Sequence, residues 1–203
     1  MKIDVIIPVY KPGRELFELL DRLEKQTIPV QKIILMNTEE KYFEQLVYGT
    51  DFTRTHSNVE VHHLSKLEFD HGGTRHWGVQ YSDAEIFVTM TQDAMPADRY
   101  LIERLTENLY DSVAVAYARQ LPASDCRETE RISRYFNYPA KSRIKTADDI
   151  GTLGIKTFFC SNVCAAYRRD IYEELGGFIR HTIFNEDMIY AAGAVRAGYG
   201  IAY

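Results

Sequence analysis

The strongest constraint on the fold is the order of apolar runs and helical patterns near the start of the chain. Residues 3–9 (IDVIIPV) and 32–36 (KIILM) are short, β-branched runs, typical of strands buried on both faces. Between them, four leucines recur at the spacing of one helix face: Leu16, Leu19, Leu20 and Leu23. A strand, a helix and a second strand within residues 3–36 indicate a parallel βαβ unit.

The same alternation continues as far as residue 117. The patterns predict helices over 39–48, from the FDHGGTRHWG stretch through about Tyr81, and over 98–109, with strands over 59–64, 86–91 and 113–117. Between about 120 and 157 the pattern weakens, which predicts a long, partly irregular excursion of the kind that is usually functional or mobile. Regularity returns at Phe158, a helix is expected over 185–197, and residues 200–203 resemble the start of a strand. We therefore expect one α/β domain with a largely parallel sheet.

Composition excludes some classes of protein. The 203 residues carry a net charge of −5, which argues against general nucleic-acid binding. No apolar run approaches the roughly 20 residues that a membrane-spanning helix needs. The three cysteines (Cys126, Cys160 and Cys164) are an odd number without a second pair to complete a zinc site, so we expect free thiols in a reduced, cytoplasmic compartment.

Polar residues follow several of the predicted strands. Because ligands of open α/β sheets bind outside the carboxyl ends of the strands, we expect four stretches to converge on one rim. These stretches are Pro8–Tyr10, Asn37–Glu39, Gln92–Ala94 and the segment from His71 to Arg75. Tyr10 offers an aromatic face for a nucleotide base, and Asn37 offers amide donors and acceptors. The alternatives are that Tyr10 covers a sheet edge and that Asn37 caps the following helix.

The remaining rim residues suit a charged ligand. Gly72 and Gly73 expose backbone near a helix start, where N–H groups favour phosphate, and Arg75 adds a permanent cation. Asp93 is suited to hold a divalent cation that neutralises a diphosphate. The glycine pair fits neither common phosphate-loop pattern, and Asp93 before Ala-Met-Pro is also compatible with an ordinary turn.

A second chemical stretch is FNEDMIYAA, residues 184–192. Glu186 and Asp187 stand at the predicted start of a helix, where acidic side chains are favoured by the helix dipole. The functional interpretation is a general base at the rim of the sheet that takes a proton from an attacking hydroxyl. Neighbouring acids at a helix start point in different directions, so at most one of the pair is expected to have this role.

Taken together, these motifs resemble the family 2 glycosyltransferases. The strand that ends in Pro8-Val9-Tyr10, the acid at Asp93 and the Glu186-Asp187 pair carry the resemblance to the family. The finer pattern is similar to its rhamnosyltransferase-like branch, through FDHGGTRHWG (69–78), TQDAMP (91–96), FFCSNVCAAYRR (158–169), LGGF (175–178) and NEDMIYAA (185–192). The likeness spans nearly the whole chain.

The resemblance implies a GT-A fold in a single domain, 1–203, with a nucleotide-sugar-binding half (1–118) and an acceptor-side half (119–203). It also implies inverting transfer of a sugar from a nucleotide diphosphate donor, with bound Mg²⁺ or Mn²⁺. By the same likeness Asp93 matches the last acid of the family's metal-binding DxD motif and Asp187 matches the catalytic base. The donor-side residues would be Pro8, Tyr10, Asn37, Gly73, Arg75, Gln92 and Asp93, and the acceptor-side residues Glu186 and Asn162.

The chain departs from the family pattern in three places. Thr91 stands where many relatives have the first acid of DxD, which puts metal dependence in question, and Asn37 stands where many have an acid near the nucleotide. The chain stops at Tyr203, whereas relatives of this branch usually continue, so a C-terminally truncated chain is expected.

The branch suggests rhamnose as the sugar and a growing, lipid-linked saccharide as the acceptor in cell-surface polysaccharide synthesis. That acceptor would place the protein peripherally at the inner face of the membrane. Two other hypotheses remain at this stage. The first is a nucleotide-sugar-binding domain that has lost catalysis, which the missing first acid favours. The second is a nucleotidyltransferase, for which Lys11-Pro12-Gly13-Arg14 is a faint motif.

Overall fold

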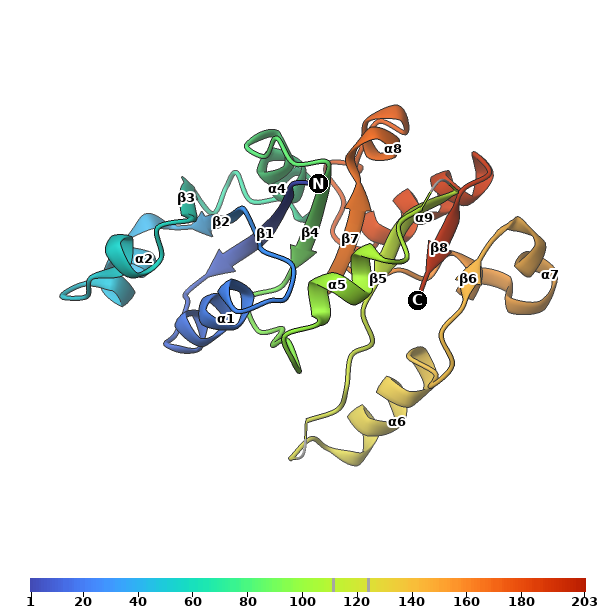
Figure 1. The fold of residues 1–203 in the computed structure, drawn as a ribbon, viewed down its shortest axis with the longest axis horizontal. Helices are drawn as coiled ribbons and strands as arrows, with labels where there is room; N and C mark the ends of the chain where they lie inside the picture. The colour runs from blue at the N-terminus through green and yellow to red at the C-terminus, as the bar shows by residue number, and fades with distance from the viewer. Residues whose placement is uncertain (111, 124) are drawn as a thin grey trace.

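The fold is organised around an eight-stranded mixed sheet in the order β3-β2-β1-β4-β7-β5-β8-β6 (Figure 1). It is seen in a computed structural model that describes residues 1–110, 112–123 and 125–203. The strands are β1 (Ile3–Tyr10), β2 (Lys32–Thr38), β3 (Val59–Leu64), β4 (Ile86–Met90), β5 (Val113–Tyr117), β6 (Ile144–Lys145), β7 (Cys164–Arg168) and β8 (Gly200–Ala202). Of these described strands, β7 and β6 run against the other six, so the predicted α/β class with a largely parallel sheet is confirmed.

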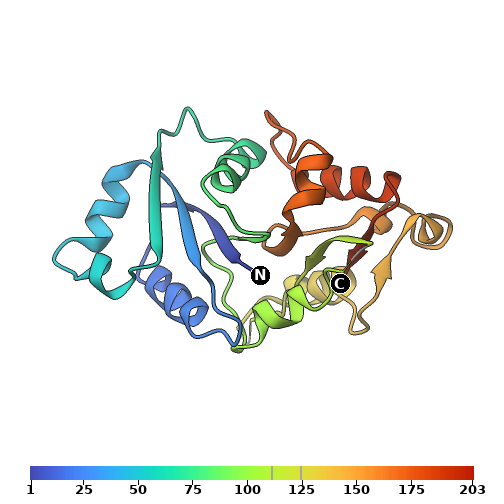
Figure 2. The ribbon, with the colours of Figure 1, turned by 45° about the horizontal axis from the view of Figure 1, so that its top comes forward.

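Helices connect the strands and cover both faces of the sheet. The α-helices are α1 (Glu15–Glu24), α2 (Glu40–Val47), α3 (Phe52–Thr55), α4 (His71–Gln80), α5 (Leu101–Thr106), α6 (Glu128–Asn137), α7 (Ile150–Leu153), α8 (Arg169–Glu174) and α9 (Glu186–Arg196). Two short 3₁₀ turns, Ala147–Asp149 and Gly154–Phe158, flank α7. Figure 2 shows α1 and α5 on one side of the sheet, and α4, α8 and α9 on the other.

Alternation along the central strands supplies a core on each face. Ile3, Val5 and Ile7 of β1 pack with the buried leucines of α1, whereas Ile6 packs with the aromatic side chains of β7, α8 and α9. The four leucines predicted to share a helix face, Leu16, Leu19, Leu20 and Leu23, are each 0–1% exposed. Burial of these side chains on both faces makes the sheet a rigid platform for its carboxyl edge.

The structure differs from the predicted elements in several places, and the short helices α3 and α8 were not predicted. The strand β7 was not predicted, because CAAYR is short and weakly alternating, and its pairing with both β4 and β5 holds it in the sheet. The helix α5 is shorter than the expected 98–109. The excursion over 120–157 contains the ten-residue helix α6, none of whose described residues is buried. The apolar side chains of α6 are limited to Ile132, Tyr135 and Phe136 among ten mostly polar residues, so the sequence pattern gave only a weak helix signal.

The two predicted halves share one sheet, since β7 of the second half lies between β4 and β5 of the first. The division at residue 118 stays a prediction. The free cysteines Cys160 and Cys164 are buried, as expected of small apolar side chains, and Cys126 is half-buried. Within the described part of the chain, no helix combines the length and apolarity needed to cross a bilayer.

Candidate active site

The carboxyl ends of β1, β2 and β4 lie together, as the sequence predicted. Strand register places Val9 opposite Asn37 and Tyr10 opposite Thr38. The side-chain amide of Gln92 makes two hydrogen bonds to the backbone of Tyr10. It accepts from the N–H of Tyr10 at 2.9 Å and donates to the carbonyl of Tyr10 at 3.0 Å. Gln92 therefore extends the contact between β1 and the segment after β4 beyond the last paired residues of the two strands.

Three of the predicted donor-side residues line this edge in different ways. The ring of Tyr10 is 38% exposed and meets Tyr42 edge-on at 5.6 Å between centroids, which leaves part of its face open to a ligand. Pro8 is half-buried within β1, opposite Met36. Asn37 is fully buried, and its Nδ2 lies 2.9 Å from Nδ1 of His63, so the alternative of a helix cap is wrong.

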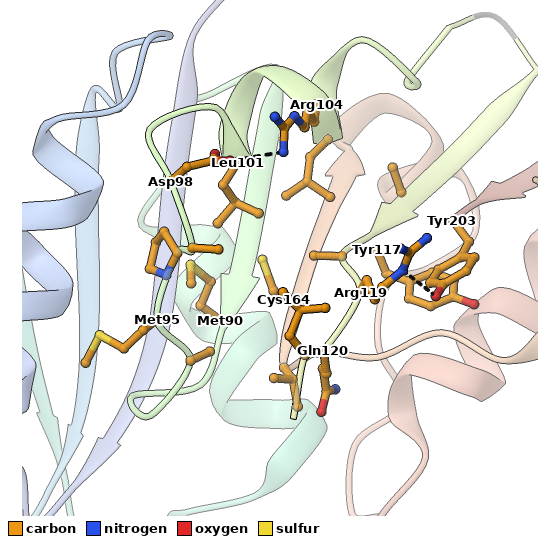
Figure 3. Close-up of a pocket in the computed structure, with 18 of the residues that line it drawn as sticks. Met90, Met95, Asp98, Leu101, Arg104, Tyr117, Arg119, Gln120, Cys164 and Tyr203 are labelled. Carbon is orange, nitrogen blue, oxygen red and sulfur yellow. Dashed lines mark hydrogen bonds and ion pairs between the residues drawn. The ribbon is translucent and has the colours of Figure 1, made fainter. Parts of the chain in front are cut away.

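Asp93 follows β4 and lines a cavity of about 590 Å³. Figure 3 shows this cavity with Met90, Leu101 and other lining residues labelled. The cavity lies between β4, α5 and the segment after β5, and its walls combine apolar side chains such as Met90 and Leu101 with charged ones such as Arg104 and Arg119. Next to Asp93, the hydroxyl of Thr91 is buried without a hydrogen-bond partner among the described residues. An acceptor oxygen and a carboxylate therefore stand two residues apart at this end of β4.

The start of α4 is a tightly packed corner. The backbone N–H of Gly73 donates to Oδ1 of the N-cap residue Asp70, so this amide is occupied in the structure. Gly72 is required for a different reason, since a Cβ there would collide with the carbonyl oxygen of Ile179. The glycine pair lets α4 approach the segment before α9, and a donor-binding role for Gly73 stays a prediction.

Arg75 of α4 and Glu186 of α9 form a buried ion pair. Nη1 of Arg75 lies 3.1 Å from Oε1 of Glu186, and it also donates to the carbonyl of His71 at 2.9 Å. Nε of Arg75 is buried with no hydrogen-bond partner among the described residues. The guanidinium therefore joins α4 to the start of α9.

Asn162 lies at the centre of a buried hydrogen-bond network. Its Nδ2 donates to Oε1 of Glu186 at 3.0 Å, and its Oδ1 accepts from the hydroxyls of Thr89 and Tyr167, both at 2.7 Å. Its backbone N–H donates to Oδ2 of Asp187 at 2.9 Å. Both the side chain and the backbone of Asn162 thus connect β4 and β7 to the Glu186–Asp187 pair.

Asp187 lines a second cavity of about 400 Å³. Burial is the main reason that the pKa of its carboxyl is raised above the ordinary value, an effect that the Asn162 N–H bond opposes. Asn185, the residue before α9, has a left-handed backbone with φ of 68°. Such a conformation in a residue other than glycine is uncommon and often marks a functional turn.

The two acidic motifs come together through one short connection. The N–H of Thr91 donates to the carbonyl of Val163 at 3.1 Å. The preceding residue, Asn162, donates its backbone N–H to the carboxylate of Asp187. The segment after β4 that carries Asp93 is therefore fixed beside the segment that supports Asp187. Sequence patterns indicated both motifs but not the residues of α6 that line the second cavity, because the helix itself was not predicted.

The described residues include a cluster with suitable metal-ligand atoms elsewhere. Asp21, Glu24 and His56 bring a ligand atom each within 4.8 Å of one another. They lie on α1 and after α3 rather than at the carboxyl edge, and the imidazole of His56 already contacts Glu24 at 2.8 Å. Exposed acidic groups of this kind are common, and the cluster gives no support to a metal at Asp93.

Comparison with known proteins gives consistent matches. The family described as "Glycosyl transferase family 2" matches residues 4–176. O-antigen chain rhamnosyltransferase RfbN of Salmonella typhimurium is 40% identical over the whole chain, and rhamnosyltransferase WbaN of Salmonella anatum is 37% identical over 98% of it. The chain spans 64% and 62% of the lengths of these two relatives.

A solved structure has the same fold. The mannosyltransferase PcManGT from Pyrobaculum calidifontis, in complex with GDP-Man and Mn²⁺, superposes with a TM-score of 0.69 at 17% identity. The superposition covers 98% of this chain and 53% of that one. At this level of identity the likeness concerns the fold.

Proposed function

The chain belongs to glycosyl transferase family 2, and on that premise we propose that it transfers a sugar from a nucleotide diphosphate to a saccharide with inversion. The observation that carries the proposal is the position of Asp187. Its carboxylate is held by backbone N–H groups, lines a cavity, and lies close in the fold to the segment that bears Asp93. A half-buried base beside a second acidic segment fits a single displacement between two bound substrates.

In the proposed reaction, Asp187 takes the proton of an acceptor hydroxyl as its oxygen attacks the anomeric carbon. The bond between that carbon and the diphosphate oxygen breaks, and its electron pair leaves with the nucleoside diphosphate. Attack from the side opposite the leaving group inverts the anomeric centre. The raised pKa of Asp187 suits this role, because a stronger base accepts a proton more readily.

The residues around Asp93 fit a divalent cation in part. Asp93 supplies one carboxylate and Thr91 an unpartnered hydroxyl, both oxygen ligands of the kind that Mg²⁺ and Mn²⁺ prefer. With a single carboxylate, the donor phosphates would have to complete the shell, a common arrangement for Mg²⁺. A bound cation would neutralise charge on the leaving diphosphate. A mannosyltransferase of the same fold is described in complex with GDP-Man and Mn²⁺, which supports a divalent cation as part of the proposed donor complex.

For the substrates, we propose a rhamnosyl donor and an O-antigen chain as the saccharide acceptor, guided by the names of the two Salmonella relatives, and we propose further that this chain is lipid-linked as it grows. One face of α6 supports contact with an anionic membrane surface, since Ile132, Tyr135 and Phe136 are 60–68% exposed. Residues 119–156 carry eight Lys and Arg against five Asp and Glu, whereas the whole chain is negative. An exposed apolar helix face among basic residues is typical of peripheral attachment.

Sedimentation with vesicles tests the membrane contact. The wild type should bind vesicles that contain phosphatidylglycerol, and the triple change Ile132→Ser, Tyr135→Ser and Phe136→Ser should abolish binding. Binding that survives in the triple variant, or that is equal on neutral vesicles, would assign another role to this face of α6.

Sugar transfer itself is tested with UDP, GDP and dTDP sugars, rhamnosyl donors included, each with a saccharide acceptor and Mn²⁺. Asp187→Asn should reduce kcat by about two to four orders of magnitude, the usual scale of general-base loss. Donor affinity, measured by calorimetry, should stay within a factor of about two, because the amide is isosteric and the base contacts the acceptor. If affinity falls as far as the rate, Asp187 belongs to the donor site instead.

The same measurements distinguish the proposed enzyme from the alternative of a catalytically impaired binding domain. That alternative predicts tight binding of a nucleotide sugar with no turnover in the wild type, and no further effect of Asp187→Asn. The hydrogen bonds that hold Asp187 favour the enzyme, since a domain without catalysis has no need of an oriented base.

A further inference from the structure

The helix α6 places an arginine where the two cavities meet. Arg134 lines both the 590 Å³ cavity that contains Asp93 and the 400 Å³ cavity that contains Asp187. Among the described lining residues it is the one that the two cavities share. Close to it in the lining, Gln120 of the first cavity donates from its amide to the hydroxyls of Tyr138 and Ser161, which line the second cavity.

The charge of Arg134 is only weakly neutralised in the structure. Its ion-pair partner among the described residues is Glu130, one helical turn away, with 3.5 Å between Nη2 of Arg134 and Oε1 of Glu130. The side chain of Arg134 is 35% exposed, so it keeps access to solvent and to a ligand. An exposed pair of this length and spacing contributes little to stability, so exchanging Glu130 for a phosphate oxygen is favourable.

Resting on the proposed function, we propose that Arg134 binds the diphosphate of the donor and stabilises it as it leaves. With the base at Asp187 and the cation site at Asp93, the breaking bond between sugar and diphosphate lies between the two cavities. As that bond breaks, its electron pair moves onto the diphosphate oxygen, and a planar cation there stabilises the added charge. Arg134 is then a catalytic residue supplied by α6.

The proposal also accounts for the reduced set of acids after β4. Asp93 offers a cation one carboxylate, and Thr91 offers only a hydroxyl. A cation is therefore bound less strongly here than it would be by two acids. A permanently charged guanidinium supplies positive charge that does not depend on metal affinity. Asp98 and Arg104, which also line the first cavity, form their own pair at 3.1 Å and leave Arg134 as the cation at the junction.

The same helix provides a matched control. Arg131 is paired with Glu128 at 3.1 Å and its side chain is 41% exposed, so it resembles Arg134 in charge, pairing and exposure. It does not contribute to either described cavity lining. Arg131→Ala therefore measures the effect of losing a positive charge from α6 while Arg134 still lines both cavities.

The test measures calorimetric binding of UDP, GDP and dTDP, and of the matching monophosphates, with Mn²⁺ to the wild type and to Arg134→Ala, Arg134→Lys and Arg131→Ala. For the base that the wild type prefers, Arg134→Ala should weaken diphosphate binding about tenfold to a hundredfold, the scale of one charged hydrogen bond. Monophosphate binding should change less than about threefold, because the lost contact is to the second phosphate. Arg134→Lys should fall between, since it keeps charge without the bidentate geometry.

In turnover, Arg134→Ala should lower kcat by about a hundredfold to a thousandfold, as the loss of one transition-state donor does elsewhere. Arg131→Ala should match the wild type in both measurements. Equal effects of the two alanine changes, or equal losses of mono- and diphosphate, would overturn the proposal, as would a wild type that binds no nucleoside diphosphate. A wild type that binds diphosphates through Arg134 but transfers no sugar would overturn the proposed function and leave this contact standing.

Discussion

Arg75 and Glu186 face each other at 3.1 Å with only 7% of each side chain exposed, and this pair joins α4 to the first turn of α9. Sequence reasoning assigned the two residues to different substrates, Arg75 to the donor and Glu186 to the acceptor. In the structure the two side chains form an ion pair with each other. Because Asp187 follows Glu186 directly, the ion pair fixes the segment from which the proposed base projects.

We therefore expect single substitutions of the pair to be far more harmful than their combination. Arg75→Met or Glu186→Leu alone leaves a buried charge without its partner and should reduce the free energy of unfolding by about 3–5 kcal/mol. The double variant should recover much of that loss, since apolar side chains of similar volume often replace a buried pair well. Denaturant unfolding of the four proteins measures the coupling.

Donor affinity of the same variants decides between the two roles of Arg75. If the double variant folds and binds the nucleoside diphosphate as tightly as the wild type, Arg75 is a positioning residue. A stable double variant that has lost binding would return Arg75 to the donor site, as the resemblance implied.

The pH dependence of turnover follows from the raised pKa of Asp187. Burial favours the neutral carboxyl, so the base is protonated at a higher pH than an ordinary aspartate would be. Protonated Asp187 cannot accept a proton, so kcat should fall on the acid side with an apparent pKa above 3.8. A profile measured with the wild type at saturating substrates checks this, and the acid limb should be absent from the residual activity of Asp187→Asn.

The same shift has a consequence for stability. With the pKa higher in the folded state than in the unfolded chain, the folded protein binds the proton more tightly between the two values. The contribution of this group to stability is then fully present at low pH and is lost as pH rises through the folded pKa. Asp187→Asn removes the dependence, so the difference in unfolding free energy between variant and wild type should grow with pH across that window.

How far the sequence predicted the site depends on what each residue touches. Asp93, Gln92 and Tyr10 follow strands whose carboxyl ends a parallel sheet brings to one edge, so their position could be predicted, whereas their roles stay predictions. Arg75 was singled out as a cation on the predicted rim and Asn162 by resemblance, but their burial and partners come from packing between β7, α4 and α9. Arg134 was missed, because its significance depends on where an exposed helix lies over two cavities.

The network around Asn162 should be both structural and functional. Asn162→Ala removes one hydrogen bond each from Thr89, Tyr167 and Glu186 and should cost about 2–4 kcal/mol of unfolding free energy, since these polar groups are buried. The backbone N–H to Asp187 survives the change, so a residual rate is expected. Thr89→Val removes one donor at similar volume and should cost less, about 1–2 kcal/mol.

The turnover number of the folded variant shows whether Asn162 positions Asp187 or only stabilises the fold. If Asn162 orients Asp187, the folded Asn162→Ala protein should lose kcat by about tenfold to a hundredfold with little change in the KM for the donor. A variant that is destabilised but turns over at the wild-type rate below its unfolding temperature would make the network purely structural.

The last prediction concerns Asp93 and the divalent cation. Asp93→Ala should abolish the increase in nucleoside diphosphate affinity that Mn²⁺ produces, because it removes the carboxylate that would bind the ion. Asp98→Ala is the matched control, since Asp98 lines the same cavity but is already paired with Arg104 at 3.1 Å. Calorimetry with and without Mn²⁺ gives the comparison. An Mn²⁺ effect that persists in Asp93→Ala and disappears in Asp98→Ala would move the cation to the other end of the cavity. If Mn²⁺ changes affinity in none of the three proteins, the positive charge needed by the leaving diphosphate must come from side chains such as Arg134.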